Sequence, residues 1–221
     1  MRDRPVDEGP APLPRSPYLS GLAPYPFTRL DALRREVEEG GVEVIDLGMG
    51  DPGLDTPELV RRALVESIPR RSSYPRVAGL SELRHAAAGW IGRRFGVRVD
   101  PELELLPVNG SKEAIFTLPL ALVDPEQRPV VIVPDPAYPV YALGARAAGG
   151  EVYRVPLLAG NGFLPDLEAI PDSIWSRAAI FWINYPNNPT GTVAGTRFLE
   201  SAVTLCRDNG VLLAADEAYV D

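Results

Sequence analysis

Several residue types that carry enzyme chemistry are nearly absent from this 221-residue sequence. Cys206 is its single cysteine, so no disulfide can form within the chain, and a reducing compartment fits that composition. His85 is its single histidine, and one histidine with one cysteine is too few side chains for an ordinary zinc site. We therefore expect no metal centre, and we expect Cys206 to be a small buried apolar residue rather than a nucleophile.

Positive charge is also in short supply. The chain has 22 basic residues against 30 acidic ones, a net charge of −8 at pH 7. This balance argues against nucleic acid and anionic membrane surfaces as partners. No apolar run approaches membrane-spanning length, and residues 1–5 lack the apolar core of a signal peptide. The sequence thus predicts a cytoplasmic protein that binds neither nucleic acid nor membrane.

Proline, by contrast, is abundant, and seven of the 24 prolines fall within residues 1–26. Because that stretch shows almost no periodicity, we expect an extended or flexible arm there. Apolar positions in residues 27–39 then predict a short amphipathic helix that ends at Gly40.

From residue 42 onward, short apolar runs alternate with helical segments. This alternation predicts an α/β fold, with a largely parallel sheet covered by helices on both faces. The predicted strands are residues 42–47, 103–108, 130–133, 151–155, 178–183 and 211–215. The predicted helices are a segment that begins with Thr56 as its N-cap, then residues 81–95, 109–122, 139–148 and 196–208. In helix 81–95 the side chains expected to face inward are Leu83, Ala87, Trp90, Ile91 and Phe95.

A glycine pattern after the first predicted strand is also typical of a nucleotide-binding site. Residues 48–53 match G-x-G-x-x-G, the dinucleotide-binding fingerprint. The context is unfavourable, because the helix begins only near Thr56 and no second strand ending in an acidic residue follows. A nucleotide-binding α/β module therefore remains the alternative interpretation.

Four loops that follow strands or open helices carry complementary polar chemistry. Residues 110–112, Gly-Ser-Lys, open a helix, where backbone N–H groups and the helix dipole suit a phosphate. Tyr138 can offer a flat face to a ring, and Asn188 can donate to an oxygen of a ligand. Asp216 ends an apolar strand, where a protonated heteroaromatic nitrogen would be a fitting partner, and Tyr219 lies within reach of the same ligand. Together these features describe the surroundings of pyridoxal 5′-phosphate (PLP).

Each of these residues also has an ordinary structural interpretation. Ser111 and Asp216 are both good helix N-caps, which need no ligand. Tyr138 and Tyr141 could simply pack as core aromatic residues. The combination of the four loops, rather than any one of them, favours a cofactor site.

The order of these motifs along the chain resembles the class I/II aminotransferases, which are PLP enzymes of fold type I. The resemblance runs from about Tyr25 to Asp221 and is specific because six motifs occur in family order. The motifs are Leu47-Gly-Met-Gly-Asp-Pro52, Tyr74-Pro-x-x-x-Gly79-Leu-x-Glu-Leu-Arg84, Gly110-Ser-Lys-Glu113, Pro136-x-Tyr-Pro139, Asn188-Pro-Thr-Gly191 and Asp216-Glu-Ala-Tyr219.

The resemblance implies a role for each matching residue at the cofactor. Gly110, Ser111 and Lys112 would hold its phosphate, and Tyr138 would stack on its ring. The phenolic oxygen of the ring would be bound by Asn188 and Tyr219, and the pyridine nitrogen would pair with Asp216.

The same resemblance extends to substrate, subunits and domains. Gly50 would lie beside the substrate carboxylate, and Tyr74 would reach the phosphate of a neighbouring subunit, which implies a homodimer. Residues 1–45 would form an N-terminal arm and short helix belonging to the small domain. Residues 46–221 would form part of the PLP-binding large domain. The implied reaction moves an amino group between an amino acid and a 2-oxo acid.

One departure from the family pattern limits that expectation. The family's catalytic lysine, which forms a Schiff base with PLP, follows the Asp-x-x-Tyr motif, whereas the only lysine here is Lys112. The resemblance therefore implies a chain truncated at its C-terminal side, without the Schiff-base lysine, and inactive or nearly so by itself. A non-catalytic PLP-binding module is a further alternative. Residues 24–30, followed by Leu-Gly-Met-Gly-Asp-Pro, resemble aminotransferases of lysine biosynthesis that act on N-succinyl-diaminopimelate. Similar openings occur in aminotransferases for aspartate, alanine or aromatic substrates.

Overall fold

Strand β3 (Ala178–Asn184) is buried along its whole length, as the unbroken apolar run predicts. In the computed structural model, which describes residues 26–48, 50 and 53–220, β3 lies inside a four-stranded sheet in the order β2-β1-β3-β4. All three strand pairs are parallel. The remaining strands are β1 (Val130–Asp135), β2 (Glu151–Pro156) and β4 (Leu212–Asp216).

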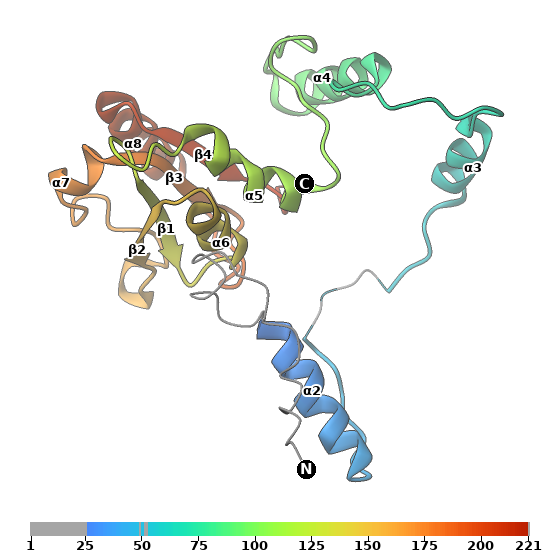
Figure 1. Cartoon of the computed structure of the whole chain (residues 1–221), viewed down its shortest axis with the longest axis horizontal. Helices are drawn as coiled ribbons and strands as arrows, with labels where there is room; N and C mark the ends of the chain where they lie inside the picture. Colours follow the sequence, from blue (N-terminus) through green and yellow to red (C-terminus); the bar gives the residue numbers. More distant parts are fainter. Residues whose placement is uncertain (1–25, 49, 51–52, 221) are drawn as a thin grey trace, which may run out of the picture. The chain divides into compact units, whose positions relative to one another are not determined.

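Helices cover both faces of this sheet (Figure 1). On one face, Val130 and Phe181 of the sheet pack in one cluster with Ala202 and Cys206 of helix α8. On the other face, Trp182 packs in a second cluster with residues of α5 and α6. The flanking elements are α5 (Ser111–Leu122), α6 (Val140–Ala147), η1 (Ala159–Asn161), α7 (Asp172–Trp175) and α8 (Thr196–Asn209).

This arrangement confirms the predicted α/β fold with a parallel sheet between two helical layers. Each of its four strands lies where the apolar runs predicted it, within one residue or a few at either end. The short helices η1 and α7 were not predicted, because segments of three and four residues are too short to show a helical period.

The chain divides into two compact units, with the boundary between Pro107 and Val108. We call the part described over residues 108–220 the sheet unit, and the part described over residues 26–107 the helical unit. The helical unit contains α2 (Pro26–Glu39), α3 (Glu58–Ser67) and α4 (Ser81–Phe95). The expected division into residues 1–45 and 46–221 concerns the domains of a whole enzyme and stays a prediction.

A single buried side chain organises the end of the helical unit. Arg84, only 5% exposed, donates from Nε to the carbonyl oxygen of Pro101 at 2.7 Å and from Nη1 to that of Ala78 at 2.7 Å. Its guanidinium also pairs with Glu102, and this hydrogen bond lowers the pKa of the Glu102 carboxyl below its ordinary value. Arg84 therefore ties the loop before α4 to the turn after it.

Two predicted strands of the helical unit are wrong. Residues 42–47 and 103–108 contain no strand, and Ile45 and Leu103 are each more than four-fifths exposed. A strand exists only when a neighbour supplies the other half of its hydrogen bonds, and neither segment has a paired neighbour among the described residues. This result also weakens the nucleotide interpretation, because no strand precedes the G-x-G-x-x-G pattern and the next helix begins at Glu58.

Two details of the predicted helices also need correction. Pro57, not Thr56, is the N-cap of α3, and no side-chain bond caps this helix. In α4 the five side chains expected to face inward are not buried; Arg84 is the buried residue of that helix. The apolar side of a helix indicates which side can be covered, but the covering surface has to be present.

Candidate functional site

The carboxyl ends of β1, β3 and β4 and the start of α5 meet around a cavity of about 200 Å³. In open parallel sheets this end of the strands is where ligands bind. The cavity is lined by Ser111, Tyr138, Asn184, Asn188, Asp216, Ala218 and Tyr219. Five of these were predicted site residues, and they come from four separate segments of the chain.

Helix α5 brings its positive end to this cavity. Gly110 is the N-cap with φ +85°, a left-handed conformation that a side chain would strain, and Ser111 is the first helical residue. The N-cap interpretation of Ser111 is therefore wrong, and its side chain lines the cavity instead. The backbone N–H of Asn109 donates to Glu113 Oε2 at 2.6 Å, which fixes the turn that enters the helix.

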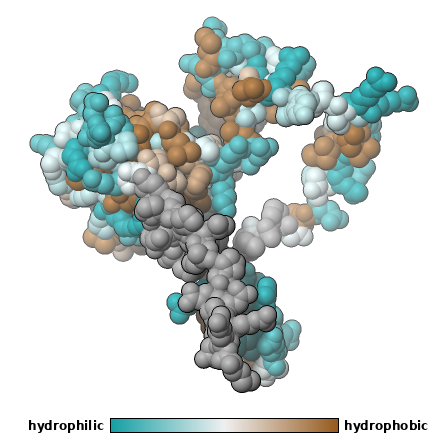
Figure 2. All heavy atoms as spheres, in the orientation of Figure 1, coloured by the Kyte–Doolittle hydropathy of each residue, from teal (hydrophilic) through white to brown (hydrophobic). Residues whose placement is uncertain are grey.

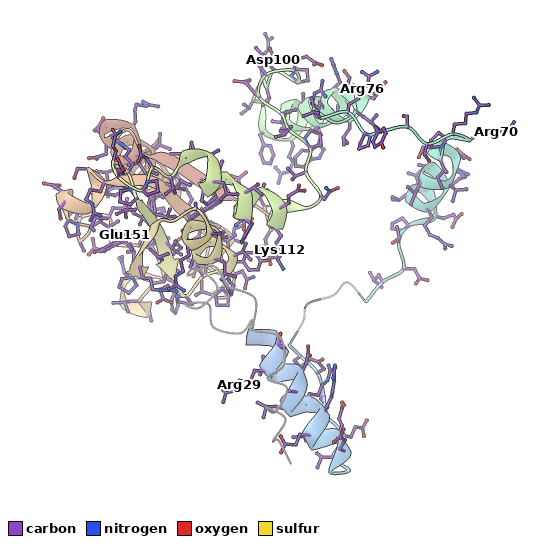
Figure 3. All side chains as sticks on the ribbon, viewed as in Figure 1. Arg29, Arg70, Arg76, Asp100, Lys112 and Glu151 are labelled. Atoms are coloured by element: carbon purple, nitrogen blue, oxygen red, sulfur yellow. The ribbon has the colours of Figure 1, made fainter. Side chains whose placement is uncertain are left out.

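Lys112 follows in the first turn of α5 and is labelled in Figure 3. It does not line the cavity, and neither does Gly110. Both residues lie next to Ser111 in the chain, so a phosphate at the helix start would be within their neighbourhood. Their direct part in binding stays a prediction.

Two tyrosines follow β1, one in the loop and one in α6. One lines the cavity, and the other packs in the core. Tyr138 is partly exposed and lines the cavity, and its ring meets that of Tyr141 edge to face, with the centroids 5.9 Å apart. Tyr141 is fully buried and stacks on Trp182, with a centroid distance of 4.8 Å and an interplanar angle of 16°. The core interpretation is thus correct for Tyr141, while Tyr138 packs against the same cluster and also lines the cavity.

Tyr141 also reaches the carboxylate of Asp216. Its hydroxyl donates to Asp216 Oδ2 at 2.6 Å, and the backbone N–H of Ala218 donates to Oδ1 at 3.3 Å. Burial and the neighbouring carboxylate both raise the pKa of Tyr141 far above its ordinary value. The hydroxyl therefore stays protonated and holds Asp216 in one orientation.

Asn188 and Tyr219, both predicted to bind the same oxygen, lie against each other. Asn188 Nδ2 donates to the hydroxyl oxygen of Tyr219 at 3.3 Å. Tyr219 is 53% exposed, and both residues line the cavity. Two polar groups that close to one another can both reach one ligand atom.

The two remaining predicted site residues belong to the helical unit. Tyr74 is 99% exposed, and Gly50 is exposed with open space where a Cβ would stand. Neither residue lines the cavity.

Three residues at this site were not predicted from the sequence. They are Asn184, Ala218 and Tyr141, the last as a hydrogen-bond donor to Asp216. For Tyr141 no local pattern in the sequence indicated this contact, because Asp216 lies 75 residues further along the chain. For Asn184 the signal was an amide that ends an otherwise apolar strand. Ala218 contributes a backbone N–H, which no residue type reveals.

Among the residues that the structure describes, no group of three or more His, Cys, Asp or Glu side chains could hold a metal ion. None of the described helices combines the length and the apolar character needed to cross a membrane.

Comparisons with known proteins agree on one family. The model of the family "aminotransferase class I and II" matches residues 42–221. An LL-diaminopimelate aminotransferase from Desulforudis audaxviator is 48% identical over 203 residues, which cover 91% of this chain and 51% of that protein. The chain thus spans about half the length of the relatives it matches.

Solved structures give the same answer for the fold. The substrate-bound structure of BacF from Bacillus subtilis matches with a TM-score of 0.85 and 32% identity, covering 93% of this chain and 52% of BacF. A probable N-succinyldiaminopimelate aminotransferase from Thermus thermophilus matches with a TM-score of 0.80 and 36% identity, covering 88% and 52% of the two chains. The predicted fold type I is therefore confirmed. On the family match, these relatives and the shared fold, the chain belongs to the class I and II aminotransferases.

Proposed function

We propose that this chain binds PLP at the carboxyl end of its sheet and provides the cofactor half of an aminotransferase site. The observation that carries the proposal is the convergence of Ser111, Tyr138, Asn188, Asp216 and Tyr219 on one cavity. Each of these residue types matches one chemical part of PLP, and they come from four segments separated widely in sequence. A chance gathering of ordinary core and cap residues would not sort by ligand chemistry in this way.

The donor set fits the cofactor from end to end. Backbone N–H groups and the Ser111 hydroxyl at the start of the 12-residue helix α5 suit a phosphate, with Gly110 and Lys112 beside them. The face of Tyr138 suits stacking on a ring. Asn188 and Tyr219, 3.3 Å apart, suit the phenolic oxygen of the ring.

Asp216 is the residue on which the chemistry would depend. Its carboxylate, held by the Tyr141 hydroxyl at 2.6 Å, would face the pyridine nitrogen and favour its protonated form. PLP with a protonated ring acts as an electron sink for the bond changes of amino-group transfer. The chain's own residues would bind, orient and polarise the cofactor.

Proton transfer in the reaction needs a further group that can both take and give a proton. Arginine cannot do this, because its guanidinium stays protonated, and Lys112 is the chain's only lysine. Since Lys112 stands beside Ser111 in the first turn of α5, we assign it to the phosphate end. General acid–base help is worth roughly 10²–10⁴-fold. We therefore expect the 221-residue chain to bind PLP but to transaminate at a negligible rate.

The substrates we propose are an amino acid and a 2-oxo acid, with Gly50 beside a substrate carboxylate. The relatives named LL-diaminopimelate aminotransferase support a diaminopimelate-like amino donor, and so a place in lysine biosynthesis. The Thermus structure supports the N-succinyl form of that donor. A turnover panel on the full gene product would decide between them, and a clear preference for a small or aromatic amino acid would reject both.

We further propose a cytoplasmic homodimer in which Tyr74 of each copy reaches the phosphate of the other copy. The near-complete exposure of Tyr74 leaves its ring available for such a contact. In that assembly, residues 1–45 would belong to the small domain and residues 46–221 to the large domain.

The direct test is titration of the 221-residue chain with PLP, followed by absorbance. Because the aldehyde of PLP also reacts with exposed amines, the Lys112→Arg variant serves as the reference, keeping a cation but no reactive side-chain amine. We expect saturable binding that Asp216→Ala and Ser111→Ala weaken. Saturable binding of NAD without binding of PLP would reject the proposal and favour a nucleotide-binding module.

A further inference from the structure

Asn184 is the last residue of β3, and the residue is only 2% exposed. A buried amide has to use its donor and its acceptor, because each unpaired group costs free energy. Both are used here. Asn184 Nδ2 donates to the backbone carbonyl oxygen of Asp216 at 2.7 Å, and Asn184 Oδ1 accepts from the backbone N–H of Asn188 at 2.7 Å.

These two bonds join the segments that carry the proposed ring contacts. Asp216 ends β4, and its Cα is paired in register with that of Asn184 across the parallel ladder. Asn188 lies four residues beyond Asn184, in the loop that follows β3. One side chain therefore fixes Asn188 and Asp216 relative to each other.

The neighbouring Asn187 shows what a purely local amide does in the same loop. Its Oδ1 accepts from the backbone N–H of Thr190 at 3.2 Å and from the Thr190 hydroxyl at 2.7 Å. Those bonds shape the loop internally, whereas the bonds of Asn184 connect the loop to the end of β4.

Only an amide supplies this pair of bonds at this size. Aspartate at position 184 would keep the acceptor for Asn188 but would lose the donor to Asp216 and add a negative charge beside its carboxylate. An apolar residue would leave a buried carbonyl and a buried N–H without partners.

We infer that Asn184 is a positioning residue of the cofactor site, which sets the spacing between the group that faces the ring nitrogen and the group that faces the phenolic oxygen. This inference rests on the proposed PLP site. Asn184 touches neither ring atom directly in that proposal and acts through Asp216 and Asn188.

The test compares Asn184→Asp with Asn209→Asp in the 221-residue chain carrying Lys112→Arg. Asn209 is a partly buried asparagine whose Nδ2 donates to the carbonyl oxygen of Leu205 within α8, so it is a matched change away from the cavity. We expect Asn184→Asp to raise the PLP dissociation constant about tenfold, as loss of one buried hydrogen bond would. We also expect it to shift the ring ¹⁵N resonance of labelled PLP, while Asn209→Asp changes neither.

A double-mutant cycle separates positioning from a general loss of packing. In a background that carries both Asp216→Asn and Asn188→Ala, Asn184→Asp should weaken PLP binding by much less than tenfold, because both side chains that Asn184 positions are already changed. A full and additive effect in that background would overturn the inference.

The outcomes for the two proposals are distinct. If neither the unaltered chain nor the Lys112→Arg reference binds PLP, the proposed function fails and the inference falls with it. If the reference binds PLP and Asn184→Asp binds within twofold with an unchanged ¹⁵N resonance, the inference alone is wrong. If Asn184→Asp fails to fold, the inference is tested instead by NMR of the Asn184 side chain in the reference chain. The side-chain amide protons of Asn184 should exchange slowly and shift on adding PLP, and fast exchange without a shift would reject the bridge.

Discussion

The sheet unit and the helical unit of this chain differ in where their apolar side chains lie. In the sheet unit, Ile132, Phe181 and Tyr141 are fully buried within two clusters on either side of the sheet. In the helical unit, Arg84 is the buried side chain among the described residues, and α3 and α4 carry apolar side chains on their surface (Figure 2). The sheet unit thus contains its own core, whereas the apolar side chains of the helical unit are largely exposed.

Hydrogen exchange should show the largest difference between the two units. Amides in β1 and β3 can exchange only when the sheet opens, whereas those of α3 can exchange by local fraying. We expect the β3 amides to exchange more slowly by a factor on the order of 10³ or more. Equal exchange in both units would show that the helical unit has a core of its own in solution.

Truncation of a single apolar side chain should give the next largest difference. Phe181 is fully buried and meets Trp175 edge to face at 5.7 Å, so Phe181→Ala should lower the free energy of unfolding by about 3–5 kcal/mol. Leu64 in α3 is 66% exposed, and Leu64→Ala should change the free energy of unfolding by less than about 0.5 kcal/mol. Urea denaturation followed by tryptophan fluorescence measures both, and a large loss for Leu64→Ala would mean that α3 is packed.

Within the helical unit, Arg84 should be the exception. Arg84→Met removes the donors to Ala78 and Pro101 and should cost this unit about 1–3 kcal/mol, seen as faster hydrogen exchange in residues 76–104. The pKa of Glu102 should also rise toward its ordinary value, which NMR titration would detect. Arg61→Met is the control. The Arg61 side chain is 65% exposed, and its Nη1 lies 3.6 Å from Glu58 Oε2, so this surface ion pair should contribute little to stability. Similar effects from both variants would contradict the assigned role.

The smallest effect should appear at alkaline pH, through Cys206 in the core of the sheet unit. Burial raises the pKa of its thiol to about 12, compared with about 8.5 for a free thiol. Because the folded pKa is the higher one, the stability from the protonated thiol is fully present below about pH 8.5 and is lost as the pH rises toward 12. The free energy of unfolding should therefore fall between pH 8.5 and 10, more steeply than in Cys206→Ala. A parallel dependence in that variant would exclude the thiol as the cause.

The sheet unit could be predicted from sequence because its segments carry their own signals. Apolar runs at residues 130–133 and 178–183 fit only buried strands, and helical periods between them required a parallel arrangement. The site followed from the same reasoning, since polar loops after parallel strands must gather at one edge.

The failures have a shared physical cause, which is dependence on a partner. Residues 42–47 alternate like a strand, but a strand needs a neighbour, and the sequence of one segment does not state whether one is present. The role of Asn184 was not predicted for the same reason. Its role depends on the register that sets it opposite Asp216, and no local pattern specifies that register.

The most direct test of the central claim is hydrogen exchange of the Lys112→Arg chain with and without saturating PLP. We expect slower exchange at the start of α5 and in the segments around Tyr138, Asn188 and Asp216, with α3 and α4 unchanged. Slower exchange around Tyr74 at concentrations where the chain dimerises would add support for a shared site. Unchanged exchange in all four cavity segments, or slower exchange confined to residues 48–58, would contradict PLP binding at this cavity.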